Sequence, residues 1–214
     1  MILISPEGHS LTERDFLSLL HRHNIFTESV FRRHEMNHVI HLTGGKGIDV
    51  GCGLNKIHSQ AIGIDKRLGQ KDVGYSFGTQ IQGSGDRLPW FETGSLDYVF
   101  SSHALEHMSH VESTLREWHR IIVPGGRLVL ILPDKRRYPN IGQPGANPDH
   151  KHDFLPGDIE AILARVGFRV MQIDTISRKL EADPWATWEA PKYGHKTLNF
   201  SFEVVAVKDH HDSG

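Results

Sequence analysis

The feature that most constrains the fold is the stretch GIDVGCGLNKIHSQAIGID at residues 47–65. Two short apolar runs flank a turn with two glycines, a pattern typical of neighbouring parallel strands. Only seven residues, 54–60, separate Gly53 from Ala61, whereas a crossover between parallel strands normally takes at least about 10–12 residues. Seven residues span about 24 Å when extended but only about 10 Å as helix. We therefore predict no more than one or two helical turns here, followed by a short second strand.

From residue 46 onward, strand-like and helix-like patterns alternate. Runs such as LDYVF, RLVLIL and FEVVAVK have the composition of buried strands, and helical patterns separate them. This alternation predicts an α/β fold in which a mostly parallel sheet is covered by helices on both faces. The expected strands are 47–51, 61–65, 79–82, 96–101, 126–132, 168–176 and 198–207, and the expected helices are 109–122 and 157–166.

Two helical patterns precede this alternation. Ser10 and Glu13 form a capping-box signature ahead of an apolar stripe, and Thr27 can cap a second helix. We expect helices at 10–22 and 28–42. The predicted organisation is an N-terminal helical cap at 1–43, one ligand-binding domain at 44–208 and a tail at 209–214.

Composition excludes several classes of function. The 214 residues carry 24 Lys plus Arg against 26 Asp plus Glu, for a formal net charge of -2, so no global basic field attracts nucleic acid or an anionic membrane. The longest apolar run, LVLIL at 128–132, is far too short to insert into a bilayer. The single cysteine, Cys52, cannot form an internal disulfide and suits a reducing compartment. We therefore expect a cytoplasmic protein that does not bind nucleic acid and does not insert into a membrane, and composition does not indicate its oligomeric state.

The glycine turn has the chemistry of a small anion site. Gly51 and Gly53 allow a sharp turn and the close approach of a ligand. The amides from Cys52 to Asn55 are expected to be free at the start of the segment that follows. A pyrophosphate would call for a third glycine at the place of Lys56, so a smaller anion such as an amino-acid carboxylate fits better.

Two aspartates complete this description of the ligand. Asp49, just before the turn, can hold the turn's own amides or meet a cationic ligand. Asp65 ends the next strand, where a carboxylate can accept both hydroxyls of a ribose. A ligand with a carboxylate, a positive charge and a ribose, but no phosphate, is S-adenosylmethionine. GIDVGCG and GIDK resemble the first two motifs of the class I S-adenosylmethionine-dependent methyltransferases; an NAD-dependent oxidoreductase fits less well because of Lys56 and Asp49.

The resemblance extends over about residues 45–208 in the family's order. IQGSGDRLPW is similar to the adenine loop, GSLDYVFSSHALEHM to the fourth strand and the turn after it, and LREWHRIIVPGGRLVLILPD to the helix, Pro-Gly-Gly turn and fifth strand. It implies a Rossmann-like seven-stranded sheet with an antiparallel last strand. The short crossover and LPDKRRY resemble a subset often linked to sugar and polysaccharide pathways. The cofactor-binding residues implied are Asp49, Gly51, Cys52, Gly53, Asp65, Lys66, Ser84, Gly85, Asp86 and Ser101.

Two sites depart from the family or compete with it. The family often has an acid directly after the glycine of the adenine loop, where Ser84 stands here; Ser84 or Asp86 could serve. HALEH, with His103, Glu106 and His107, matches a zinc-protease pattern that needs a long helix and a third ligand. Because the pattern directly follows a strand and a helix break is expected before residue 109, we do not assign a metal ligand.

His103 is the first candidate catalytic residue in the methyltransferase interpretation. An imidazole with its ordinary pKa near ~6.5 can accept a hydroxyl proton at neutral pH. The alternative is a structural histidine that bonds to the loop backbone. An essential base is not required, because much of the rate enhancement can come from holding acceptor, methyl group and sulfur in line.

The loop at 133–156, with five prolines, is expected to bind the acceptor. Its cationic start suits a phosphate or carboxylate, and its end, NPDHKHDF, could bind a divalent metal or simply close the loop. Trp185, Trp188 and Tyr193 could form a flat wall for a sugar ring. We predict methyl transfer to oxygen of a small molecule or sugar; the alternatives are a non-catalytic cofactor-binding protein and a zinc hydrolase. The predicted acceptor-binding residues are Lys135, Arg136, Tyr138, His150 and His152.

Overall fold

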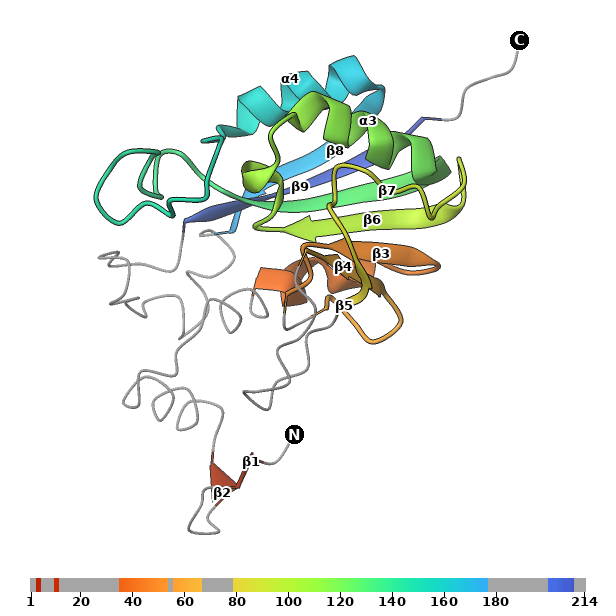
Figure 1. Ribbon diagram of the computed structural model, residues 1–214, viewed down its shortest axis with the longest axis horizontal. Helices are drawn as coiled ribbons and strands as arrows, with labels where there is room; N and C mark the ends of the chain where they lie inside the picture. The colour runs from red at the N-terminus through yellow and green to blue at the C-terminus, as the bar shows by residue number, and fades with distance from the viewer. Residues whose placement is uncertain are drawn as a thin grey trace.

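The computed structural model describes residues 3–4, 10–11, 35–53, 56–66, 79–176 and 200–209. Among them, seven strands form one sheet in the order β5-β4-β3-β6-β7-β9-β8 (Figure 1). The five strands from β5 to β7 in this order are parallel, and β9 is antiparallel to both of its neighbours. The predicted Rossmann-like sheet and its antiparallel last strand are thereby confirmed. The strands are β3 (Gly47–Val50), β4 (Ile62–Asp65), β5 (Thr79–Gln82), β6 (Leu96–Ser102), β7 (Ile122–Pro133), β8 (Phe168–Thr175) and β9 (Ser201–Lys208).

Helical segments cover both faces of this sheet. On one face α3 (Val111–Ile121) and α4 (Pro156–Val166) lie side by side (Figure 1). α3 buries an apolar stripe that includes Leu115, Trp118 and Ile121, at the spacing expected of an amphipathic helix. On the other face, helical residues 35–39 and the 3-10 turn η1 (Ile40–Leu42) bring Met36 and Val39 against Tyr98 and Phe100 of β6.

The N-terminal prediction is only partly confirmed. Ser10–Leu11 form strand β2, which pairs antiparallel with β1 (Leu3–Ile4), so a helix beginning at Ser10 is wrong. The helical pattern did not take into account a nearby apolar segment able to pair with this one. Residues 35–39 confirm part of the helix expected at 28–42. The remainder of both predicted helices lies outside the described residues, and the domain boundary at 43 stays a prediction.

β7 begins four residues earlier than expected, at Ile122 instead of 126. α3 therefore runs directly into β7 at Ile121, and the Pro-Gly-Gly segment lies inside the strand. The pairing register between β6 and β7 shifts between Leu96 and Tyr98, where Leu96 faces Ile122 but Tyr98 faces Arg127. The extra residues on β7 thus form a bulge that a period-two strand pattern does not reveal.

The crossover between β3 and β4 is short, as predicted. Residues 56–60 form bends and turns without a helix, and β4 begins at Ile62. The Lys56 ammonium donates hydrogen bonds to the carbonyl oxygens of Ser59 (3.1 Å) and Ala61 (2.8 Å) and to Gln80 Oε1 (3.0 Å). One side chain thus satisfies carbonyl groups that a helix would pair internally.

Apolar and acidic side chains complete this crossover. Ile57 and Ala61 pack on the face of the sheet that also carries Met36 and Tyr98. The Ile57 amide donates to the buried Oδ2 of Asp49 at 2.7 Å. The segment therefore covers this face of the sheet as a helix would. The side chains of Lys56 and Asp49 pair its backbone groups in place of helical hydrogen bonds.

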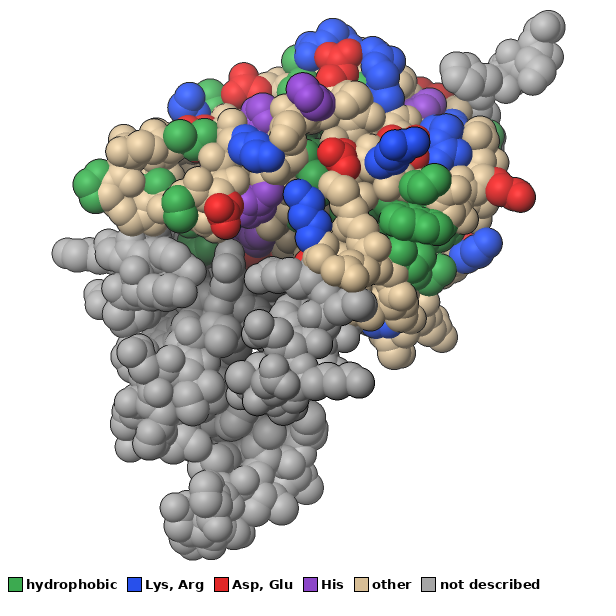
Figure 2. All heavy atoms as spheres, viewed as in Figure 1, with side chains coloured by type: hydrophobic (Ala, Val, Ile, Leu, Met, Phe, Trp, Pro, Cys, Tyr) green, Lys and Arg blue, Asp and Glu red, His purple; other side chains and the backbone are tan. Residues whose placement is uncertain are grey.

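Charged side chains of both signs are interspersed on the face of the molecule shown in Figure 2. This distribution agrees with the formal net charge of -2 and offers no extended basic surface on the part of that face that the structure describes. None of the helices in the described residues has the length and apolar character needed to cross a membrane.

Lys56→Met tests this account of the crossover. It removes three hydrogen bonds but keeps the length of the side chain, so we expect the free energy of unfolding to fall by about 1–3 kcal/mol. The matched control is Lys46→Met, at an exposed position just before β3, which should change stability by less than about 0.5 kcal/mol. Chemical denaturation of both variants measures the difference; equal effects would contradict the role given to Lys56.

Candidate active site

The site lies at the carboxyl edge of the parallel strands. β3, β4, β6 and β7 all end at this edge, and the turns that follow them carry most of the predicted cofactor-binding and acceptor-binding residues. Ligands of open α/β sheets bind at such an edge where the strand order reverses. In this sheet the order reverses between β3 and β6, which are neighbours although two strands separate them in sequence.

The glycine turn after β3 packs closely against the turn after β6. Gly51 has a φ of 72°, and a Cβ added to it would lie 2.4 Å from the Cβ of Ala104, so only glycine fits there. The amides of Gly51 and Cys52 donate to the carbonyl oxygen of Ile64 at 2.7 and 3.2 Å. The Gly53 amide donates to Asp65 Oδ2 at 3.0 Å.

These contacts correct one expectation about the turn. The amides of Cys52 and Gly53 are not free, because the short crossover folds the turn back onto β4 instead of leading into a helix. Leu54 and Asn55, which complete the expected anion site, lie outside the described residues. The turn itself is as predicted, but its first amides stabilise the junction of β3 and β4.

Three of the predicted cofactor residues have buried side chains that bond within the protein. Asp49 accepts the Ile57 amide, which belongs to the crossover that follows the glycine turn. Ser101 Oγ donates to the carbonyl oxygen of Val50 at 3.1 Å, linking β6 to β3. Cys52 Sγ lies 3.6 Å from Thr79 Oγ1 on β5. Their contribution to a ligand site is to fix the backbone at the strand ends.

Asp65 stands at the end of β4, where a ribose-binding carboxylate is expected. A carboxylate offers about four acceptor positions, so the bond from Gly53 does not by itself exhaust Asp65. Lys66, the next residue, is exposed, and its carbonyl oxygen accepts a hydrogen bond from Gln82 Nε2 at 3.1 Å. The structure thus connects the glycine turn, the end of β4 and the end of β5.

The predicted adenine loop is anchored to α3 by residues that the sequence reading did not single out. Trp118 Nε1 donates to the carbonyl oxygen of Gly85 at 2.7 Å, and Glu117 Oε1 accepts from the Leu88 amide at 2.9 Å. Arg120 binds Glu117, whose pKa is lowered chiefly by that hydrogen bond. The signal for this anchor was the Glu-Trp-His-Arg segment, whose Glu and Arg lie one helical turn apart.

The loop residues face different surroundings. Ser84 begins a turn, with its carbonyl oxygen 3.4 Å from the Arg87 amide. Asp86 lines a shallow hollow of about 450 Å³ between the loop and α3, together with Arg87, Arg116 and Arg120. Ser84 and Asp86 are the two candidates for binding the adenine amino group. Of these, Asp86 lies on the side of the loop that faces α3.

His103 directly follows β6 and is tightly held. Among the described residues it is the one non-glycine with a positive φ, at 51°. Its Nε2 donates to Glu35 Oε2 at 2.8 Å, and Ser201 Oγ lies 3.2 Å from the same nitrogen. Its Nδ1 is 3.6 Å from Glu106 Oε1, a contact between charges that is longer than a hydrogen bond.

The environment of His103 determines its charge. Burial alone would lower the pKa of His103, but the negative charge of Glu35 and the neighbouring Glu106 carboxylate outweigh it and raise that pKa to about 10. The imidazole then carries two protons at neutral pH and cannot accept a third. A ring that is already protonated does not suit the role of general base predicted for His103. The prediction did not include Glu35, a residue of the N-terminal segment, as a partner of this histidine.

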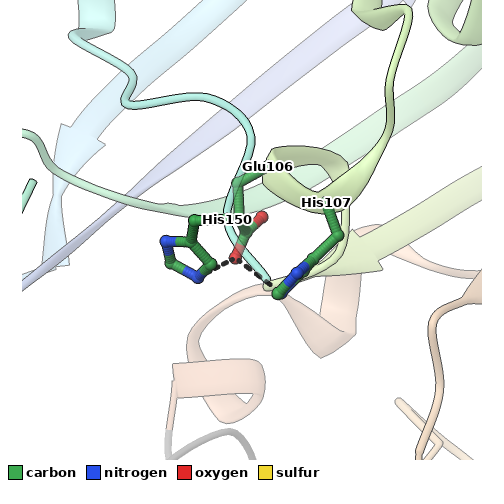
Figure 3. A group of neighbouring side chains, drawn as sticks. All are labelled: Glu106, His107 and His150. Carbon is green, nitrogen blue, oxygen red and sulfur yellow. Dashed lines mark ion pairs between the residues drawn. The ribbon is translucent and has the colours of Figure 1, made fainter. Parts of the chain in front are cut away.

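HALEH does not form the helix that the zinc-protease pattern needs. Leu105–His107 form the short 3-10 turn η3, and α3 begins only at Val111. Glu106 and His107 instead meet His150 from the acceptor loop: both rings approach the same Glu106 carboxylate oxygen (Figure 3), and they contact each other edge to face with centroids 4.7 Å apart. The predicted helix break is confirmed. The third group near Glu106 and His107 is His150, which follows Asp149, the residue 42 positions after His107 whose carbonyl oxygen accepts from the His107 ring.

The predicted acceptor residues fall into two groups. Lys135, Arg136 and Tyr138 line one open hollow of about 540 Å³. Arg136 also binds the buried Asp134, with Nε 2.9 Å from Oδ1. His150 is not among the residues that line this hollow, but its ring stacks on Tyr138 with centroids 5.2 Å apart.

His152, the other predicted acceptor residue from the end of the loop, contacts a different neighbour. His152 stacks on Phe154 with centroids 5.9 Å apart, and is also not one of the lining residues. Trp185, Trp188 and Tyr193, the proposed aromatic wall, lie outside the described residues.

Comparisons with known proteins agree with this geometry. Residues 48–130 match a family described as "Methyltransferase domain". The demethylmenaquinone methyltransferase of Staphylococcus haemolyticus (strain JCSC1435) is 29% identical over 118 residues, which are 48% of this chain and 49% of that protein. The chain thus spans about half the length of the curated relatives it matches.

Solved structures extend the likeness over most of the chain. An S-adenosylmethionine-dependent methyltransferase of Archaeoglobus fulgidus has a TM-score of 0.63 at 15% identity and covers 91% of this chain and 100% of its own. A chain of the complex between the Haloferax volcanii Trm112 methyltransferase activator and a methyltransferase has a TM-score of 0.62 at 18% identity, covering 94% and 99%. At these identities the likeness establishes the fold.

The strand order, the glycine turn and Asp65 at the end of β4 define the fold of the class I S-adenosylmethionine-dependent methyltransferases. Over residues 48–130 the chain is similar to the methyltransferase domain family, and the solved structures that share its fold include S-adenosylmethionine-dependent methyltransferases.

The charge of His103 can be tested by NMR titration of the protein kept metal-free with a chelator. We expect its ring signals to stay in the imidazolium form through pH 8 and to titrate with a pKa of about 10. Because this pKa lies above the unfolded value near ~6.5, the charged ring stabilises the fold below pH ~6.5, and its contribution is lost as pH rises toward 10.

Glu35→Gln should lower the pKa of His103, since it removes the nearest negative charge but keeps the shape of the side chain. Glu92→Gln, at an exposed position away from the site, is the matched control and should leave that pKa unchanged. A His103 that titrates near ~6.5 in the unmodified protein would contradict the assignment.

Proposed function

We propose that this protein transfers a methyl group from S-adenosylmethionine to an oxygen of a small-molecule acceptor. The observation that carries the proposal is the hydrogen bond between the Gly53 amide and Asp65, which joins the glycine turn to the ribose-binding position. A ligand with an amino-acid end and a ribose needs both at one place. When bound, the cofactor supplies the methyl group on a positively charged sulfur.

The chain's own residues would then bind and orient. Asp65 accepts the ribose hydroxyls, and the 84–86 loop, held by Trp118 and Glu117, borders the base. The turn that carries His103 follows β6 beside the glycine turn, as the contact between Gly51 and Ala104 requires. With a protonated imidazole, His103 acts as a positioning residue through Glu35 and Glu106, and methyl transfer relies on alignment of the reacting atoms.

The acceptor is a small molecule with an anionic group. The hollow of about 540 Å³ has the size of a small-molecule site. Lys135 and Arg137 give it a positive rim that suits a phosphate or carboxylate, as in a nucleotide sugar, whereas the charge of Arg136 is compensated by the buried Asp134. The relative named as a demethylmenaquinone methyltransferase acts, by its name, on a small molecule too, which supports this size of acceptor but not its charge.

Calorimetry with S-adenosylmethionine tests cofactor binding. Asp65→Asn still offers an oxygen to the Gly53 amide but removes the charge that strengthens bonds to the ribose. We expect about a 10-fold to 100-fold loss of affinity, as for loss of charge-assisted hydrogen bonds. Asp209→Asn is the matched control, because Asp209 follows the antiparallel β9 and lies at the opposite end of the sheet. Unchanged affinity in Asp65→Asn would contradict the site.

Turnover with S-adenosylmethionine carrying an isotopically labelled methyl group tests the reaction. Incubation with cell extract, followed by mass spectrometry, should show label on an oxygen of an anionic small molecule. Binding of the cofactor without any labelled product would favour the alternative, a non-catalytic cofactor-binding protein. Label on a nitrogen or a carbon would overturn the oxygen assignment while leaving the methyltransferase assignment in place.

A further inference from the structure

The strongest unexplained feature is a cluster of one carboxylate and two imidazoles next to the acceptor loop. Glu106 Oε1 lies 4.0 Å from His107 Nε2 and 3.8 Å from His150 Nε2. One atom of each residue lies within 4.8 Å of the others. Figure 3 shows both rings directed toward the same carboxylate oxygen, from two different segments of the chain.

Glu106 is an unusual buried acid. Its side chain has no exposed surface, and neither carboxylate oxygen has a hydrogen-bond partner among the described residues. Buried carboxylates are normally paired by hydrogen bonds or coordinate a metal, because an ion removed from water without compensation is costly. The contact to His103 Nδ1, at 3.6 Å, gives charge compensation without a hydrogen bond.

The surrounding contacts hold this cluster in position. His107 Nδ1 lies 3.1 Å from the carbonyl oxygen of Asp149, which can only accept, so Nδ1 donates this hydrogen bond and Nε2 is the ring nitrogen left to coordinate an ion. The amides of Lys151 and His152 donate to the Glu106 carbonyl oxygen at 2.9 and 3.2 Å. These bonds fix the loop that supplies His150 to the turn that supplies Glu106 and His107.

We propose that Glu106, His107 and His150 bind one divalent transition-metal ion, and that Zn²⁺ matches this ligand set best. Two imidazoles and a carboxylate form a zinc ligand set that leaves a fourth position for water or a substrate oxygen. The point in the plane of the three ligand atoms that is equidistant from them lies at most about 2.5 Å from each. Zinc–nitrogen bonds of ~2.0–2.1 Å at tetrahedral angles place ligand atoms about 3.3–3.4 Å apart. The 3.8 and 4.0 Å separations from Glu106 must therefore shorten by about half an ångström when the ion binds, and the separation of the two ring nitrogens by up to about 1.4 Å.

The site is reachable and lies beside the acceptor hollow. The His107 side chain is 30% exposed, which gives an ion access from solvent. His150 stacks on Tyr138, a residue that lines the hollow. A metal here would differ from the zinc-protease arrangement, because His103 is held by Glu35 and the third protein ligand comes from the acceptor loop.

Zinc titration of the full chain, stripped of metal by a chelator, tests the site by calorimetry without S-adenosylmethionine. We expect one ion per chain with a micromolar or tighter Kd. His107→Ala and His150→Ala should each weaken zinc binding by at least ~10-fold. His110→Ala is the matched control, because His110 is exposed and close in sequence but outside the cluster; it should bind as the unmodified protein does.

Co²⁺ in place of Zn²⁺ provides a second readout, since a four-coordinate site gives intense visible absorption that His150→Ala should remove. Thermal unfolding of each metal-free variant shows that the substitution leaves the chain folded. The proposal is overturned if the unmodified protein binds no zinc, or if both histidine variants bind it as tightly. The titration needs no methyl transfer, so its outcome and that of the turnover experiment are independent.

Discussion

The arrangement of the site depends on two carboxylates that bind backbone amides at the ends of β3 and β4. Asp49 accepts the Ile57 amide and Asp65 accepts the Gly53 amide. Together with the Lys56 ammonium, these bonds support the connection at 51–61 between two adjacent parallel strands, in which residues 56–60 form no helix. Helices normally make such connections because they satisfy their own backbone groups. Here side chains do so, and the turn is therefore folded against β4.

This solution has a consequence for ligand binding. A glycine turn that leads into a helix offers free amides to an anion, but in this protein the amides of Cys52 and Gly53 are already bonded. In the function proposed above, the carboxylate that binds the ribose is Asp65, which also accepts the Gly53 amide of the turn. Cofactor binding and the geometry of the crossover are thus coupled through one residue, and a change at Asp65 acts on both.

The second half of the site is organised around Glu106. This buried carboxylate is within 4.0 Å of nitrogen atoms from three histidines, one of which also bonds to Glu35 from the N-terminal segment. Burial makes each charge costly unless it is compensated, so the segments that bring these groups together are held in register. The turn after β6, the acceptor loop and the helical residues 35–39 consequently form one connected unit beside the strand ends.

The sequence alone determined the fold and the place of the cofactor turn. Strand periodicity, the glycines at 51 and 53 and the seven-residue spacing are local properties of the chain, and the structure confirms the strands, their carboxyl edge and the absence of a long first helix over 56–60. Tertiary structure decided the bulge in β7, the pairing of Ser10, and the environments of His103 and Glu106. Glu35 and His103 are separated by 68 residues, and His107 and Asp149 by 42. The charge state of an imidazole and the grouping of ligand atoms depend on such distant contacts, which no local pattern contains.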